Sequence, residues 1–298
     1  MAINTGNWGK LLFPGLHTVW GDSYNSYPAE YEQLFDSYNS SQAREEDVGS
    51  SFFGLVKVKE EGAPTEYDTA QQGFIDRYVN ETYSLGFIIT KELMEDDLYM
   101  TIGNQRAQAL GRSMATTKNT VGANVYNRAF NTSFTFGDGK ELIATDHPNV
   151  KGGTYSNELT TAADLSELSI EDLCIQISKT KDDAGLRIAL QPRNLIIPTD
   201  LQFDAERILN SPLQNDTANN AINAIRGKMP IAVNHFLTDQ DAWFIRTDAP
   251  NGMKLFNRVP AQFTQDNDHD TDNAKFKARE RYSFGASEKR GIFGTPGA

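Results

Sequence analysis

Hydrophobic and polar positions change their spacing several times along the chain, and these changes divide it into segments. In residues 1–50, aromatic side chains stand among glycine, proline, serine and asparagine without a steady helical or strand period. The segment holds too many aromatic residues for a disordered tail and too little periodicity for a core of its own. We therefore expect an extended N-terminal arm that lies on another surface. A chain lacking residues 1–35 should still fold but lose its contacts with other molecules.

Residues 51–90 predict a long two-stranded ribbon. Val56 and Val58 alternate with two lysines, which is the period of a half-buried strand. A break at residues 62–64, Gly-Ala-Pro, is typical of a hairpin tip, and the apolar segment FIDRYVNETYSLGFII follows it. Because an isolated pair of strands is marginally stable in water, this ribbon should project and find its partner on a neighbouring molecule.

A long helix is expected to begin after Thr90 and to continue to Asn131. Apolar residues keep helical spacing throughout this segment, and no proline interrupts it. Thr90 is a suitable N-cap for its first turn. A continuous helix of about 40 residues would be about 60 Å long at 1.5 Å per residue. Three internal glycines predict bends in it.

Two short motifs follow the helix. SFTFGDGKELIA places apolar residues around the GDG triplet at 137–139, which is a strong local signal for a hairpin. ATDHPNVKGG then sets Asp146 beside His147. A turn explains the second motif, because Asp side chains bond nearby backbone and Pro148 restricts the chain. A catalytic dyad would also need a nucleophile or a metal, and no familiar catalytic motif occurs. The turn is the prediction, and a hydrolase using Asp146 and His147 is the remote alternative.

Residues 165–275 predict a second unit of mixed type. Two helices are expected, one over SIEDLCIQISKTK with Ser169 as its cap and one that begins at Asp200. The apolar runs LRIALQPRNLIIP, PIAVNHFLTDQDAWFIRT and GMKLFNRVP predict strands. Residues 276–298 alternate apolar and charged positions, as expected for a strand that returns to the core. The whole chain therefore predicts the α+β fold class.

Composition narrows the classes of function. With 298 residues and 39% hydrophobic residues, the chain can build a core without disulfides or metal. Its 40 acidic and 28 basic residues give a formal charge of -12, which disfavours sequence-specific DNA binding. The single cysteine, Cys174, excludes a disulfide within the chain and is expected to be buried in a protein that stays inside the cell. No run approaches 18 apolar residues, so no contact with a membrane is expected.

The segment QDNDHDTDN, residues 265–273, alternates aspartates as calcium loops do. A calcium loop also needs a glycine at its sixth position and a glutamate at its twelfth. Counted from Asp266, these positions are Thr271 and Lys277. A solvated acidic loop is the better interpretation. The sequence therefore predicts no catalytic residue, no metal and no cofactor.

Aromatic residues of the arm and charged residues of the ribbon are the candidates for contacts between copies of the chain. The charged residues form a mixed cluster where the arm meets the ribbon, which favours ion pairs between molecules. The candidates are Trp8, Phe13, Trp20, Tyr24, Tyr31, Arg44, Glu45, Glu46, Lys57, Lys59, Glu60, Glu61 and Tyr67.

The order of these segments resembles the major capsid protein of tailed bacteriophages, which has the HK97-type fold. Two segments also resemble phage head subunits in their amino-acid sequence: RAFNTSFTFGDGKELIATDHPNVKGG and FKARERYSFGASEKRGIFGTPGA. The resemblance implies an HK97-like division of the chain. Its parts would be an N-terminal arm (1–50), an extended β-hairpin loop or E-loop (51–90), a peripheral domain with a spine helix (91–164), a mixed α/β axial domain (165–275) and a C-terminal strand segment (276–298).

The resemblance implies a structural protein that is not an enzyme. It would self-assemble into hexamers and pentamers of the icosahedral virion shell, which encloses double-stranded DNA without sequence-specific binding. Assembly would take place in the host cytoplasm, with scaffold, portal and decoration proteins as further partners. Some family members crosslink a loop lysine to a neighbour, but nothing around Lys57 and Lys59 indicates that chemistry, and no crosslink is predicted. The shell protein of an encapsulin-like nanocompartment is the alternative.

Overall fold

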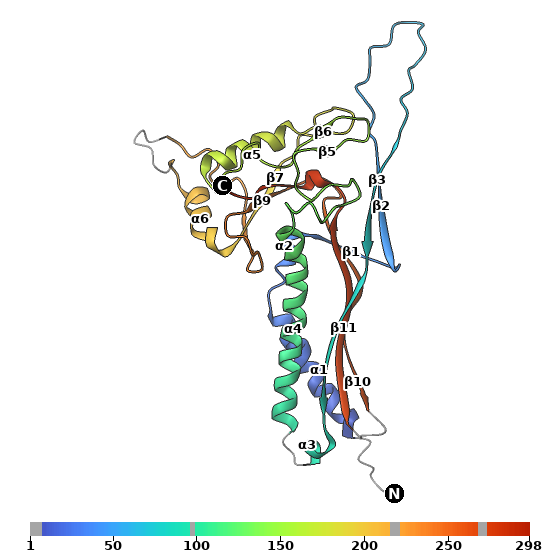
Figure 1. Ribbon diagram of the computed structural model, residues 1–298, viewed down its shortest axis with the longest axis vertical. Coiled ribbons are helices and arrows are strands. Elements are labelled where there is room, and N and C mark those ends of the chain that lie inside the picture. Colours follow the sequence, from blue (N-terminus) through green and yellow to red (C-terminus); the bar gives the residue numbers. More distant parts are fainter. Residues whose placement is uncertain (1–7, 96–98, 215–220, 268–272) are drawn as a thin grey trace.

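A long sheet and the helix α4 (Tyr99–Asn127) run side by side through the elongated part of the molecule (Figure 1). The computed structural model of the chain describes residues 8–95, 99–214, 221–267 and 273–298. The sheet has the strand order β1-β10-β11-β4. Its strands are β1 (Asp36–Asn39), β10 (Met253–Asn267), β11 (Ala274–Ala286) and β4 (Glu81–Ile89). β1 lies parallel to β10, and the other pairs are antiparallel.

A second sheet lies at the other end of the molecule, with the order β12-β9-β7-β8. Its strands are β12 (Ile292–Thr295), β9 (Trp243–Thr247), β7 (Pro192–Ile197) and β8 (Ile231–Val233). The helices α5 (Glu167–Lys179) and α6 (Gln202–Asn210) share one apolar core with it, which includes Leu173, Ile177, Trp243 and Phe293. A 3-10 turn, Thr199–Leu201, precedes α6, so this helix begins close to the predicted position.

Two boundaries in the C-terminal half differ from the sequence-based expectation. β10 and β11 form one hairpin of the long sheet, so a division at residue 275 falls within that hairpin. The last strand, β12, pairs with β9 in the second sheet. Residues 276–298 therefore connect the two sheets. Ser166 caps α5 in place of the predicted Ser169, because Ser169 is the third residue of a capping box and bonds back to the cap.

The N-terminal segment is helical, so the expectation of an extended arm is wrong for most of it. α1 (Trp8–Ser26) packs along α4, and α2 (Tyr31–Leu34) follows it. Leu16 and Trp20 are buried in a core shared with α4 and the long sheet. Leu34 and Phe35 are buried in the next core along the molecule. Deletion of residues 1–35 would expose both cores, and the truncated chain is now expected to lose stability.

The predicted long helix is divided. α3 (Lys91–Glu95) begins after Thr90, whose Oγ1 accepts a hydrogen bond from the backbone N–H of Leu93 at 3.4 Å. Residues 96–98, inside the predicted helix, lie outside the described residues, and α4 ends at Asn127. Gly111 allows close packing, because a Cβ at this position would lie 2.7 Å from the carbonyl oxygen of Trp20 in α1. The glycine therefore lets two helix backbones approach each other.

A buried ion pair joins α4 to the inner face of β11. Lys118 Nζ lies 3.7 Å from Glu280 Oε2, and the hydroxyl of Tyr24 in α1 donates to the same oxygen at 3.3 Å. Burial raises the pKa of Glu280 and lowers the pKa of Lys118. Burial disfavours the charged form of each group, and the attraction between the two charges offsets part of this cost. The helix and the sheet are thus held in register by polar as well as apolar contacts.

Two strands support a loop that projects from the body of the molecule (Figure 1). They are β2 (Arg44–Ser50) and β3 (Gln72–Val79), paired antiparallel. Residues 51–71 form no strand, contrary to the expectation for Val56 and Val58, although a turn does occur at the predicted tip. The second half of the predicted ribbon is β4, which belongs to the long sheet. None of the described helices is both long and apolar enough to cross a membrane.

Gly111→Ala should destabilise the subunit by about 2 kcal/mol, because the added methyl group forces α1 away from α4. Gly103→Ala is the matched control, since its Cβ would make ordinary contacts at 3.4 Å with Ile89 and 3.5 Å with Leu16. Alanine is favoured over glycine inside a helix by about 1 kcal/mol, so the control should be neutral or stabilised. Urea unfolding of the isolated subunit measures both changes. Equal effects of the two substitutions would contradict the close contact at Gly111.

Candidate functional site

Asp146 and His147 do not form a dyad. Asp146 lies at the surface, where its Oδ2 is 2.5 Å from Lys140 Nζ. His147 is fully buried, and its Nδ1 lies 2.7 Å from Oδ2 of Asp138, in the GDG triplet. The two neighbours therefore have different partners, and the proton relay that a hydrolase needs is not formed between them.

The ATDHPNVKGG motif forms a short hairpin. β5 (His147–Pro148) pairs with β6 (Thr154–Tyr155), and the backbone N–H of Asn149 donates to the carbonyl of Gly153 at 3.0 Å. Gly152 and Gly153 have φ angles of 100° and 81°, which glycine adopts readily. The prediction of a turn is confirmed. The GDG triplet also forms a tight turn, but no strands flank it.

Four side chains from distant parts of the sequence meet beneath this hairpin, and we call them the junction cluster: Asp76, Asp138, His147 and Lys289. Lys289 Nζ lies 2.7 Å from both carboxylate oxygens of Asp76. The backbone N–H of Gly137 donates to Asp76 Oδ1 at 2.8 Å. All but Asp138 are less than a tenth exposed as whole residues. The cluster ties β3, at the base of the projecting loop, to the GDG turn and to the connection between the two sheets.

Electrostatics in the junction cluster favour the ionised form of Asp138. Burial acts to raise the pKa of this carboxyl group, but the hydrogen bond with His147 and the charge of Lys289 outweigh burial, so its pKa lies below the usual range. A lowered pKa means that the carboxylate is stabilised by folding. This arrangement holds structure together and does not activate a nucleophile.

Arg290 extends the same network. Its Nη2 donates to Asn149 Oδ1 at 2.7 Å and to Asp183 Oδ1 at 2.8 Å, and its Nη1 donates to Glu288 at 3.0 Å. The guanidinium carbon lies 4.0 Å from the centre of the Tyr155 ring. Such a fully used guanidinium is typical of a structural arginine. The hairpin is therefore fixed from both sides.

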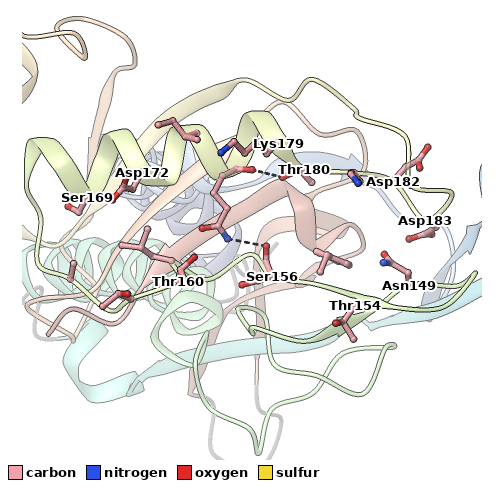
Figure 2. Close-up of a pocket in the computed structure, with 18 of the residues that line it drawn as sticks. Asn149, Thr154, Ser156, Thr160, Ser169, Asp172, Lys179, Thr180, Asp182 and Asp183 are labelled. Atoms are coloured by element: carbon pink, nitrogen blue, oxygen red, sulfur yellow. Dashed lines mark hydrogen bonds between the residues drawn. The ribbon is translucent and has the colours of Figure 1, made fainter.

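A groove of about 1040 Å³ lies between α5 and the segment that follows the hairpin (Figure 2). Gln176 lines the groove, and its Nε2 donates to the carbonyls of Ser156 at 3.2 Å and Glu158 at 2.8 Å. Its lining holds hydroxyl, amide and charged side chains, including Asp172 and Lys179, but neither histidine nor cysteine.

Among the described residues, no group of three or more histidine, cysteine, aspartate or glutamate side chains is placed to hold an ion. Most of the acidic segment 265–273 lies outside the described residues. Cys174 is buried, as expected.

The projecting loop exposes apolar side chains that a folded domain would normally bury. Leu55 is 81% exposed, Val56 97%, Val58 96% and Tyr67 93%. Phe52 and Phe53 at its base are also exposed. Several exposed apolar side chains on one element mark an interaction site, because their exposure to water is unfavourable. The loop is therefore the candidate functional site of this chain.

The predicted contact residues fall into three sets. Trp20, Tyr24 and Tyr31 pack within the chain, and the side chains of Trp8 and Phe13 lie outside the described residues. The loop presents the second set, Lys57, Lys59, Glu60, Glu61 and Tyr67, on its exposed surface.

The charged residues of β2 make contacts inside the subunit. Glu46 accepts a hydrogen bond from Arg77 at 2.9 Å and lies 3.4 Å from Arg44. Glu45 accepts hydrogen bonds from Ser40 and the following backbone, and these bonds lower its pKa. These residues anchor the base of the loop. The sequence prediction missed the exposed apolar residues of the loop as contact candidates, although their alternation with lysine was the available signal.

Solved structures that are similar to this chain include phage capsids and a virus-like particle. The virus-like particle from Pyrococcus furiosus matches with a TM-score of 0.57 and 11% identity, over 95% of this chain and 99% of that chain. A structure from Mycobacterium phage Patience matches with a TM-score of 0.56 and 12% identity, over 98% of this chain and 88% of that chain. The capsid of an empty GTA particle matches with a TM-score of 0.56 and 12% identity, over 90% of this chain and 89% of that chain. At these identities the likeness shows the fold, which is the HK97-type fold of capsid proteins.

A family model described as phage capsid protein matches residues 76–294, so the chain belongs to the phage capsid protein family. No curated protein sequence matches it. Family and fold together confirm the predicted major capsid protein, a structural component of a virion shell and not an enzyme. The hydrolase alternative is thereby discarded.

Asp138→Asn should destabilise the subunit by about 2–3 kcal/mol, because it weakens a buried charged hydrogen bond. Asp146→Asn should change stability by less than about 1 kcal/mol, since its ion pair is at the surface. The pKa of Asp138 is lowered on folding, so its contribution is present above the unfolded pKa of about 4 and is lost as pH falls through the folded value. Urea unfolding from pH 7 to pH 3 should therefore show the difference between wild type and Asp138→Asn shrinking at the acid end. A larger effect of Asp146→Asn would contradict the structure.

Proposed function

We propose that the chain self-assembles into hexamers and pentamers, which close into an icosahedral shell around double-stranded DNA. The observation that supports this most is the projecting loop, whose apolar side chains have no partner in their own subunit. A thin shell requires every subunit to bury surface on several neighbours. A loop that reaches beyond the body adds such surface without thickening the wall.

The junction cluster gives this loop a firm base. β2 and β3 are paired with each other, and Asp76 of β3 is bonded to Lys289 inside the body. Lys254 Nζ also bonds Asp47 of β2 at 2.6 Å. Because both strands are tied to the body, the loop leaves it in a defined direction. A pre-organised element loses less conformational entropy on binding than a free tail does.

The division into parts follows from the same assignment. Residues 44–79 act as the extended loop, and α4 with the long sheet forms the peripheral domain. The second sheet with α5 and α6 acts as the axial domain. Loop residues Lys57, Lys59, Glu60, Glu61 and Tyr67 are contacts between subunits. Scaffold, portal and decoration proteins are the further partners, assembly takes place in the host cytoplasm, and DNA is enclosed without sequence-specific binding.

A nanocompartment shell is the second candidate function. The likeness to the virus-like particle from Pyrococcus furiosus, which extends over nearly the whole of both chains, favours keeping it. The two candidate functions are distinguished by isolating particles from cells that produce the chain together with the products of its neighbouring genes. Nuclease-protected DNA of phage length supports the phage shell, and a co-purified protein cargo without DNA supports the alternative.

Purified wild-type chain, alone or with its scaffold, should form rings or closed shells in electron micrographs. Val56→Ser with Val58→Ser should reduce the assembled fraction at least about tenfold, because two apolar side chains no longer gain from burial. The stability of the isolated subunit should stay within about 0.5 kcal/mol, since both residues are exposed in it.

Val56→Ile with Val58→Ile is the matched control, and it should assemble like wild type. A wild-type chain that stays monomeric under all assembly conditions would contradict the proposed function. Normal assembly of the serine variant would contradict the role of the loop.

A further inference from the structure

A row of cationic side chains follows the face of the long sheet that is turned away from α4. It consists of Lys275, Lys277, Arg279 and Arg281, at alternate positions of β11. Alternate residues of a strand share one face. The residues between them are buried on the opposite face, toward the helices: Ala274, Phe276, Ala278, Glu280 and Tyr282. At about 3.3 Å per residue, this cationic row is about 20 Å long.

The neighbouring strands leave the centre of the cationic row without a counter-charge. β4 places Ser84 and Gly86 opposite Arg279 and Lys277. β10 places only glutamine and threonine opposite the same two residues. Within the described part of the chain, neither Lys277 nor Arg279 has an ion pair. Charges of one sign, held about 7 Å apart along a strand, repel one another.

Arg281, at the upper end of the row, is also incompletely bonded. Its Nη2 donates to the carbonyl of Asn80 at 3.2 Å, while its Nε is buried and has no acceptor. The chain as a whole carries 40 acidic and 28 basic residues. A cationic strip on such a protein is a local feature that an anionic partner would complete.

The tip of the projecting loop carries unpaired charge of the opposite sign. Glu60 and Glu61 are exposed beside its turn, and no cation of the described chain lies within ion-pair distance of them. The two other carboxylates of the loop are already occupied, because Glu66 and Asp68 bond lysines at 2.9 Å and 3.0 Å. Glu60 and Glu61 of the loop and Lys277 and Arg279 of β11 therefore complement each other in charge.

One chain cannot bring its own two surfaces together. Figure 1 shows the loop leaving the upper end of β2 and β3, whereas the cationic row lies in the part of β11 that runs down toward α3. In this view, down the shortest axis, α4 and the sheet lie side by side, so the outer face of the sheet points sideways out of the molecule. In a shell one subunit thick, a sideways face meets a neighbour. A limb of about ten residues reaches about 35 Å, enough to span such a contact.

We propose that the cationic row of one copy binds Glu60 and Glu61 at the loop tip of the next copy. This inference rests on the proposed function, because it needs two neighbours in a shell. The apolar limbs of the loop supply most of the buried surface. The ion pairs at the tip determine where along β11 the loop settles and exclude a like-charged surface.

Charge reversal on one side should impair assembly, and reversal on both sides should restore it. The row variant is Lys277→Glu with Arg279→Glu, and the tip variant is Glu60→Lys with Glu61→Lys. At low salt, each should lower the assembled fraction by about tenfold, since like charges now face each other. The variant with all four changes should assemble to within about twofold of wild type, because the attraction is re-formed with opposite sign. An equimolar mixture of the row and tip variants should co-assemble for the same reason.

The controls keep the charges. Lys277→Arg with Arg279→Lys and Glu60→Asp with Glu61→Asp should assemble like wild type, and circular dichroism should show every variant folded. Failure of the fourfold variant to recover, with folded subunits, overturns the inference. A row variant that assembles normally also overturns the inference. If that variant in addition fails to retard random-sequence double-stranded DNA in a gel, the row would be assigned to phosphate binding. If wild-type chain forms no particles, the proposed function fails as well, which is a different result.

Discussion

The buried ion pair between Lys289 and Asp76 is the contact on which the arrangement of the subunit depends. Lys289 lies between the last strand of the long sheet and the last strand of the second sheet, and Asp76 lies in the base of the projecting loop. Removal of either partner leaves a charge buried alone, which typically costs several kcal/mol. The ion pair therefore ties the two sheets and the loop to one another. Asp138 and His147 add a second charged contact beside the first.

This constraint explains how one chain can be rigid in the body and open at the loop. The base of the loop is tied to the body through Asp76 and Asp47. Beyond these contacts, the apolar side chains near the tip are exposed to water, whereas those of a core residue would be packed against other side chains. A capsid protein needs that combination, because its interfaces must be positioned before they are filled. The N-terminal helix strengthens the body and does not reach outward as an arm.

The sequence predicted the order of the parts but not several of their partners. Leu16, Trp20 and Tyr24 follow helical spacing in α1, yet the surrounding glycine, proline and serine obscured it. Asp146 beside His147 was misleading because successive residues of an extended chain point to opposite faces. The true partner, Asp138, comes from a turn nine residues earlier, and such a contact depends on tertiary structure. The alternation at Val56 and Val58 was real, but no neighbouring strand pairs with it inside the subunit.

Hydrogen exchange of free subunits and of assembled particles tests the central claim, that a loop fixed at its base is completed by another copy. Amides that are bonded within a stable sheet exchange slowly, and amides open to water exchange fast. Residues 72–79 should be protected in both states, and residues 51–71 should gain protection only on assembly. Protection of 51–71 already in the free subunit, or its absence in the particle, would contradict the account.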